Sequence, residues 1–224
     1  MTDPRTTLSV TEVTEAGLAD WRQLAGRLRA RFTTGSFAAG MSLVNAVSEA
    51  AERADHHPDI TITYGDVIVT LSSHDVHGIT SRDLDLAREI SGLAADRGVS
   101  ADVTGLTQLD IGLDTGRGSE LAPFYAALLG STLQRGEPVD PTGQVPTVWW
   151  QDQHDLDPDY ALPEQPFEQR WHFDVWVPED DAARRLQAVL DAGGRLVSDR
   201  GAPSFWVVED ADGNRSCLCT PAGR

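Results

Sequence analysis

Residues 56–74 of the chain read HHPDITITYGDVIVTLSSH, and this stretch decides the fold of the first half of the sequence. Two runs rich in β-branched residues, 60–64 and 67–72, flank Gly65-Asp66, a dipeptide typical of a two-residue hairpin turn. Alternation along each run places apolar side chains on one face and polar ones on the other. The predicted apolar face consists of Ile60, Ile62, Tyr64, Val67, Val69 and Leu71. We expect helices to cover that face.

Segments with helical spacing lie on both sides of the hairpin. Residues 17–31 carry apolar side chains three and four positions apart, which predicts a helix. A second helix is expected from Phe37 to about Asp55, and a third opens with the capping box Thr80-Ser81-Arg82-Asp83 and ends near Gly98. The apolar stripe of the second helix is predicted to be Phe37, Met41, Val44, Val47 and Ala51. With one more short strand near 101–103, this order predicts an α+β domain over residues 1–105, an antiparallel sheet with helices on one face.

The second half of the chain contains an internal repeat. Leu109–Leu113 and the helical segment after it match Phe173–Val177 and its following helix at a constant offset of 64 residues. A duplicated strand–helix–strands unit indicates a second domain, residues 106–224, built from two similar modules. The proline-rich, acidic segment 152–168 between the modules is predicted to be a long loop.

Charge and composition exclude several classes of function. The 224 residues carry a formal net charge of −17, so nucleic acid and anionic membranes are not expected partners. The chain contains arginine but no lysine, which excludes a lysine Schiff base. There is no long uncharged apolar segment and no leader-like start, so we expect a soluble, cytoplasmic protein. Cys217 and Cys219 are expected to point to the same side of one strand and to stay reduced.

Histidines gather around the predicted hairpin. If Gly65 and Asp66 form the turn, His57 lies opposite His74 on the polar face, and His56 lies beside them at the helix end. Imidazoles with ordinary pKa values suit acid/base chemistry at neutral pH. Three histidines also suit a zinc site, or a structural role as cations near a helix C-terminus. The spacing alone leaves all three interpretations open.

The spacing of Glu52, His56, His57, Pro58, Tyr64, His74 and Asp83 resembles the motif of the pterin-4a-carbinolamine dehydratases, over about residues 10–105. The resemblance implies removal of water from a 4a-hydroxytetrahydropterin to give the quinonoid dihydropterin, without a metal or redox cofactor. It implies His56, His57 and His74 as catalytic acid/base residues. The substrate-binding set is expected to be Glu52, Pro58, Asp59, Ser72, Ser73, His77 and Asp83. It also implies a homo-oligomer.

Several of these residues have structural interpretations as well. Glu52, one turn before His56, either orients that imidazole or is solvated. Asp83 is expected to bond backbone N–H groups as the fourth residue of the capping box, and Tyr64 to pack in the core. His77 replaces the first glycine of the family's usual His-x-x-Gly-Gly-Leu-Thr run. That change is expected either to alter the loop or to add a fourth imidazole to the pocket, since a non-glycine residue is strained at positive φ.

Residues 107–222 resemble the glyoxalase-like, vicinal oxygen chelate superfamily, whose fold is two βαβββ modules. The segments 171–177 and 205–214 carry the resemblance. His172 matches a metal-bearing strand, but Arg215 stands where Glu is frequent and the first strand offers only Gln108 and Asp110, so no complete metal set is visible. His172 is therefore expected to be a structural or pocket residue. Candidates for lining an apolar cup are Trp149, Trp150, Trp171, Trp176 and Trp206.

The leading functional hypothesis is dehydration of a hydroxylated pterin by histidine acid/base catalysis. The alternative is a non-catalytic protein that binds a small molecule in the glyoxalase-like pocket and dimerises. A third hypothesis, a metal-dependent lyase or dioxygenase in the second domain, predicts bound metal in the purified protein.

Overall fold

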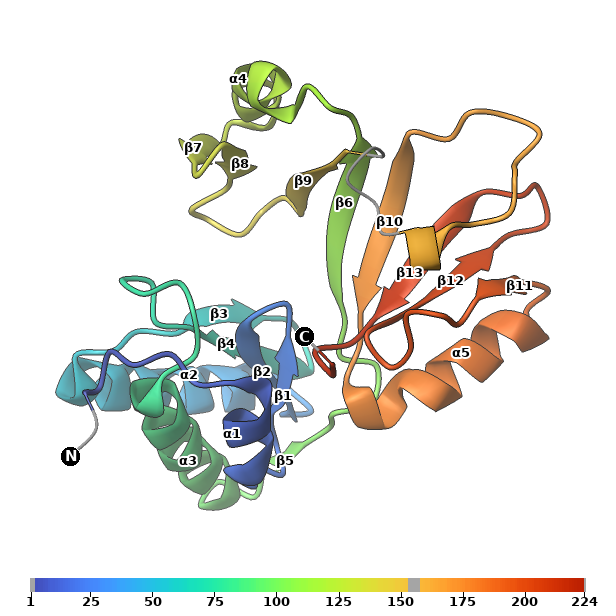
Figure 1. The fold of residues 1–224 in the computed structure, drawn as a ribbon. Helices are drawn as coiled ribbons and strands as arrows, with labels where there is room; N and C mark the ends of the chain where they lie inside the picture. The colour runs from blue at the N-terminus through green and yellow to red at the C-terminus, as the bar shows by residue number, and fades with distance from the viewer. Residues whose placement is uncertain (1–2, 153–157, 224) are drawn as a thin grey trace. The chain divides into compact units, whose positions relative to one another are not determined.

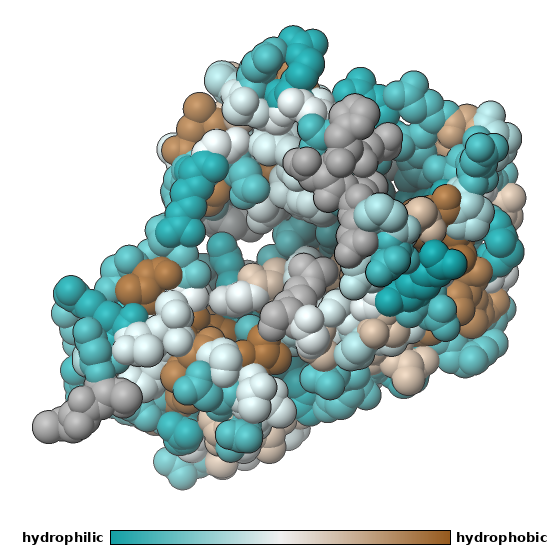
Figure 2. All heavy atoms as spheres, viewed as in Figure 1, coloured by the Kyte–Doolittle hydropathy of each residue, from teal (hydrophilic) through white to brown (hydrophobic). Residues whose placement is uncertain are grey.

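The structure, a computed structural model, describes residues 3–152 and 158–223 and divides into two compact units, with the boundary between Leu106 and Thr107 (Figure 1). Both units combine helices with sheets, as predicted for an α+β protein. Figure 2 shows that hydrophilic residues cover most of the viewed surface. In the described chain, no helix has the length and apolar character needed to cross a membrane.

The N-terminal unit is an antiparallel sheet with helices packed on one face, as predicted. The strands are β1 (Arg22–Leu24), β2 (Arg27–Thr33), β3 (Asp59–Ile62), β4 (Asp66–Leu71) and β5 (Ser100–Ala101), in the order β1-β2-β4-β3 with β5 beside β2. The helices are α1 (Val10–Glu15), α2 (Phe37–Ala54) and α3 (Ser81–Ala95). Phe32, Val69 and their neighbours on the sheet pack against Leu43 of α2 and Ile90 of α3 in one core.

The predicted helix over 17–31 is wrong, because this segment forms the hairpin of β1 and β2. Ala25 and Gly26 take φ values of 43° and 76°, and Leu24 pairs with Arg27 across this two-residue turn. In β2 the burial alternates, with Leu28, Ala30 and Phe32 buried. Apolar residues of the two strands lie on either side of a tight turn, so their positions in the sequence are three and four apart. That spacing resembles the apolar stripe of a helix.

The second helix ends as predicted, but its buried stripe coincides with the predicted one only in part. Asp55 caps α2 in the left-handed conformation, with φ 47°. Val47 and Ala51 are buried, whereas Phe37 and Met41 are 50% and 36% exposed. The burial instead follows Gly40 and Leu43, because Gly40 lies directly against Ile62 of β3.

The predicted hairpin exists, but its register is shifted by two residues. Ile62 pairs with Val67 and Ile60 with Val69, so the turn consists of Tyr64 and Gly65. Asp66 belongs to β4 because it pairs with Thr33 of β2. A shift of two leaves the same faces inside and outside, which is why the predicted apolar face survives. Tyr64 is the exception: it is 77% exposed at the turn, and the prediction that it packs in the core is wrong.

The C-terminal unit contains the two predicted βαβββ modules. The first is β6 (Gln108–Asp114), α4 (Gly118–Leu129), β7 (Thr132–Gln134), β8 (Glu137–Val139) and β9 (Thr147–Gln151). The second is β10 (Trp171–Trp176), α5 (Ala182–Asp191), β11 (Arg195–Ser198), β12 (Phe205–Glu209) and β13 (Arg215–Cys219). Six strands form one sheet in the order β11-β12-β13-β10-β6-β9, while β7 and β8 pair separately.

The connection between the modules is described only in part, because residues 153–157 lie outside the described chain. Of the predicted loop 152–168, the described part includes the short helix η2 (Pro158–Tyr160). A second short helix, η3 (Glu179–Asp181), precedes α5.

Candidate active site

The end of α2 places His56 inside the N-terminal unit. The left-handed Asp55 reverses the chain, and the His56 N–H donates to the carbonyl of Ala51 at 3.2 Å. As a result the His56 side chain turns inward and is only 8% exposed. The next residue, His57, remains exposed.

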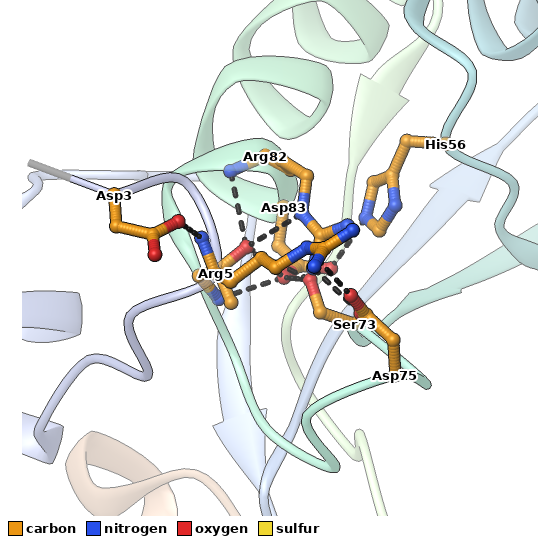
Figure 3. A network of polar contacts seen from close by, with 8 residues as sticks. Asp3, Arg5, His56, Ser73, Asp75, Arg82 and Asp83 are labelled. Atoms are coloured by element: carbon orange, nitrogen blue, oxygen red, sulfur yellow. Dashed lines mark hydrogen bonds and ion pairs between the residues drawn. The ribbon is translucent and has the colours of Figure 1, made fainter.

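His56 forms a buried pair with Asp83, from the first turn of α3. Its Nε2 lies 2.7 Å from Oδ1 of Asp83, whose side chain is fully buried. The other carboxylate oxygen, Oδ2, accepts hydrogen bonds from the Ser73 hydroxyl and the Thr80 N–H, both at 2.7 Å (Figure 3). Asp83 therefore closes the capping box, as predicted, and it also contacts a predicted catalytic histidine, a pairing that the sequence did not indicate. Its predicted role in substrate binding stays a prediction.

The protonation of this pair follows from its hydrogen bonds. Burial raises the pKa of the Asp83 carboxyl, but hydrogen bonds from His56, Ser73 and the Thr80 N–H outweigh burial, and the net pKa lies below the ordinary 3.8. An ionised carboxylate only accepts hydrogen bonds, so Nε2 of His56 is the donor. Nδ1 is then the ring nitrogen of His56 that does not bond Asp83.

The predicted contact between His57 and His74 across the hairpin is wrong. The last pair of the β3–β4 ladder is Asp59 with Thr70, so an extended ladder would bring His57 opposite Ser72. His74 instead lies in the exposed loop after β4. His57 has a different partner: its Nε2 lies 3.2 Å from Oε1 of Glu52. Glu52 thus contacts His57 and not His56, the imidazole it was predicted to orient.

The loop between β4 and α3 carries two exposed histidines, His74 and His77. Its ends are closed by a bridge in which the Ser73 N–H donates to the Gly78 carbonyl at 2.8 Å. His77 adopts φ 53°, the left-handed region that glycine would occupy without strain. His77 therefore has a glycine-type backbone conformation at the position where the motif it resembles has glycine, and its imidazole is exposed on the loop.

The remaining predicted binding residues lie at the edges of this region. Pro58 and Ser72 are half-buried, and Asp59 is exposed on β3, where its carboxylate lies 3.7 Å from Arg27. Sequence reasoning missed Arg5 and Asp75, which join the same polar network as Asp83 in Figure 3. Opposite charges at Asp75, within the histidine loop, and at Arg82, in the first turn of α3, were the available signal.

In the C-terminal unit, His172 lies over Gly112 of the neighbouring strand, where a Cβ atom would overlap its ring. Its nitrogens lie 3.6 Å from Asp114 and 3.8 Å from Asp174. Trp149 makes a T-shaped contact with the same ring, with the ring centroids 5.7 Å apart. Within the described ranges, no three His, Cys, Asp or Glu side chains are grouped so as to hold a metal ion.

The five tryptophans do not line one cup. Strand pairing places Trp149 and Trp176 on the face that carries His172. Trp150 and Trp171 lie on the opposite face and both contact Tyr125 of α4, and Trp206 lies on that face against α5.

The two cysteines are free, and both side chains lie on the face of β13 that carries His172. A hydrogen bond with Cys219, burial and the nearby Asp174 raise the pKa of the Cys217 thiol. The thiol therefore stays protonated at neutral pH and is a poor nucleophile.

The N-terminal unit is thus a small α+β domain, an antiparallel sheet with helices on one face, that contains a buried histidine–carboxylate pair and exposed histidines. Residues 6–93 match the family described as Pterin 4 alpha carbinolamine dehydratase, and residues 110–219 match the Glyoxalase-like domain. The chain belongs to the pterin-4a-carbinolamine dehydratase family through its N-terminal unit, and a glyoxalase-like domain follows.

Relatives of the N-terminal unit are close in sequence. A protein of Thermosynechococcus vestitus, named "Putative pterin-4-alpha-carbinolamine dehydratase", is 46% identical over 79 residues, 35% of this chain and 83% of its own. A protein of the same name from Nocardia farcinica is 48% identical over 77 residues, 34% of this chain and 81% of its own. Among solved structures, a transcriptional coactivator/pterin dehydratase from Brucella melitensis is 28% identical, covers 40% of this chain and 99% of its own, and gives a TM-score of 0.39.

Proposed function

We propose that the N-terminal unit catalyses the dehydration of a 4a-hydroxytetrahydropterin to the quinonoid dihydropterin. The observation that carries this proposal is the buried His56–Asp83 pair, which lies in the same unit as the exposed imidazoles of His57 and His74. The family membership of this unit supports the same reaction class.

The chemistry requires two proton transfers. An acid protonates the departing hydroxyl so that the carbon–oxygen bond breaks and water leaves, and a base removes a proton from a ring nitrogen as the carbon–nitrogen double bond forms. Exposed imidazoles suit both steps at neutral pH. In our proposal His57 and His74 contact the substrate. His56 is held as the Nδ1 base or hydrogen-bond acceptor by Asp83, and Glu52 steadies His57.

The test is the rate at which purified protein dehydrates enzymatically generated 4a-hydroxytetrahydropterin, followed by ultraviolet absorbance. We expect wild-type protein to accelerate the reaction over buffer. We expect His57→Ala and His74→Ala each to lower kcat/KM by about 10²-fold, the usual range for loss of one acid/base group.

A matched control is Arg53→Gln. Arg53 lies in the last turn of α2, shortly before the two histidines in sequence, and forms an exposed ion pair with Glu89 at 2.6 Å. This variant should keep the wild-type rate within about twofold, because exposed ion pairs contribute little. Absence of acceleration by wild-type protein would refute the proposal.

A second candidate is a non-catalytic protein that binds a small molecule through the C-terminal unit. The observation that favours it is the group of His172, Asp174 and Trp149 on one sheet face. Under this hypothesis pterin turnover is absent, and ligand binding by wild-type protein is lost on Trp149→Ala but not on His57→Ala.

A further inference from the structure

Both neighbours of the exposed His74 are anchored to α3 or to residues beside it. On one side, Ser73 is 1% exposed and its hydroxyl bonds Thr80 at 2.8 Å and Asp83 at 2.7 Å. On the other side, Oδ1 of Asp75 accepts a hydrogen bond from Nη2 of Arg82 at 2.7 Å. The position of His74 is therefore determined from both sides, although its own side chain lies at the surface.

The N-terminal segment adds a second set of contacts to the same loop. Nε of Arg5 lies 3.6 Å from Oδ2 of Asp75, so two guanidinium groups converge on one carboxylate (Figure 3). The Leu8 N–H donates to the Ile79 carbonyl at 2.8 Å, and a Cβ on Gly78 would lie 3.0 Å from the Thr7 methyl group. Residues before α1 thus run along the loop that carries His74.

The backbone conformation of the loop that carries His74 depends on these contacts. His77 holds a left-handed φ of 53°, a conformation that costs a non-glycine residue free energy and persists only where surrounding contacts impose it. The contacts of Asp75 and Gly78 lie on either side of this strained residue. If they were lost, the loop would be expected to relax and His74 to move with it.

We propose that the Asp75–Arg82 ion pair, braced by Arg5, is a positioning device that fixes the imidazole of His74 for the dehydration. This inference rests on the proposed function of the N-terminal unit. Asp75 does not touch the substrate in this scheme and acts only through the loop. The hydrogen bond from Arg82, followed by the charges of Arg82 and Arg5, holds the pKa of Asp75 below 3.8. The ion pair is therefore complete throughout the neutral range in which the histidines work.

The test compares Arg82→Gln with Arg88→Gln. Arg88 lies on the same helix, and its ion-pair partner, at 3.0 Å, is Asp85 of that helix and not a residue of the loop. We expect Arg82→Gln and Asp75→Asn each to lower kcat about tenfold with KM within about twofold, because displacement of a catalytic group mainly affects the transition state. Arg88→Gln should leave both constants unchanged, and Arg82→Lys, which keeps the charge, should restore part of kcat.

The double variant Asp75→Asn/Arg82→Gln separates a joint device from two independent effects. If the two residues act as one unit, the double variant loses no more kcat than the more damaged single variant. Multiplicative losses, or equal rates for Arg82→Gln and Arg88→Gln, would overturn the proposal.

A spectroscopic measurement keeps the proposal testable without turnover. Hydrogen exchange of the Ser73 amide and the line width of the His74 imidazole protons report the order of the loop directly. We expect both to change in Arg82→Gln and neither in Arg88→Gln. An inactive wild-type protein whose loop responds in this way would refute the proposed function and keep the positioning device. Unchanged spectra in Arg82→Gln would refute the device itself.

Discussion

Asp83 serves two parts of the N-terminal unit through its two carboxylate oxygens. Oδ2 satisfies the Thr80 N–H at the start of α3, and Oδ1 receives Nε2 of His56. A cap is a local requirement and is visible in the sequence as Thr80-x-x-Asp83. The contact with His56 joins positions 27 apart in the chain, so it depends on how α2 and α3 pack. One residue thus couples helix stability to the orientation of an imidazole.

Replacement of this residue should change stability in a pH-dependent way. The folded-state pKa of Asp83 is lowered, so its contribution is complete above the ordinary 3.8 and is lost as the pH falls through the lower folded value. We expect Asp83→Asn to lower the free energy of unfolding at pH 7 by about 2–4 kcal/mol, because it breaks a buried hydrogen-bonded network. The difference from wild type should shrink as the pH falls below 3.8.

Urea denaturation at pH 7 and at several lower pH values measures this difference. Asp85→Asn is the matched control, since Asp85 is 77% exposed on the same helix. It should change stability by less than about 0.5 kcal/mol at every pH. A difference between Asp83→Asn and wild type that grows towards low pH would contradict the assigned sign.

At the scale of elements, the sequence predicted the helix ends and strand faces, which depend on residues close together in the chain. The sequence predicted where α2 begins and ends and where the capping box of α3 lies. It also predicted the alternating faces of β3 and β4. The hairpin register was not predicted correctly, because Asp66 pairs with Thr33 of a third strand. The β1–β2 hairpin was missed because Ala25, and not an Asn or Asp, accompanies Gly26 in the turn.

For the candidate site as well, the sequence predicted residues but not the contacts between them. The histidine motif predicted His56, His57, His74 and Asp83 as site residues, and the structure brings His56 and Asp83 into contact. The motif did not reveal that Asp83 pairs with His56 and Glu52 with His57, because both contacts depend on how the chain turns at Asp55.

Two glycines allow the turn of the first hairpin to be tested. Gly26 lies in the left-handed region at φ 76° and has open space around it, whereas Gly92 lies in the interior of α3, also with open space. We expect Gly26→Ala to destabilise the protein by about 1–2 kcal/mol through backbone strain alone. Gly92→Ala should stabilise it by about 0.4–1 kcal/mol, since it favours the helix. Urea denaturation midpoints measure both, and stabilisation by both substitutions would contradict the assigned turn.

At the scale of the whole molecule, the chain joins two units that each have their own internal organisation. All residues of the candidate site, from Glu52 to Asp83, lie in the unit that ends at Leu106, and so does its large core. The C-terminal unit contains two copies of one module. The copies differ because β7 and β8 of the first pair with each other, whereas all the strands of the second belong to the six-stranded sheet. The offset of 64 residues was visible in sequence, whereas this difference was not.

A fragment of residues 1–106 should therefore fold and act without the rest of the chain. We expect its dehydration rate to equal that of the full protein within about twofold, because compact units with their own core fold independently. Circular dichroism checks folding and the absorbance assay checks turnover. A folded but inactive fragment would assign part of the reaction to the C-terminal unit.

The imidazole of His172 lies over Gly112 of the neighbouring strand, at the place where a Cβ atom of residue 112 would be. The imidazole occupies the space that any side chain at position 112 would need. The two positions, 60 residues apart and directly paired in the sheet, thus share a single volume. A larger residue at 112 requires either that the imidazole of His172 moves aside or that a smaller residue replaces the histidine. Substitutions at these two positions are therefore coupled, and this pair constrains the evolutionary paths open to the C-terminal unit.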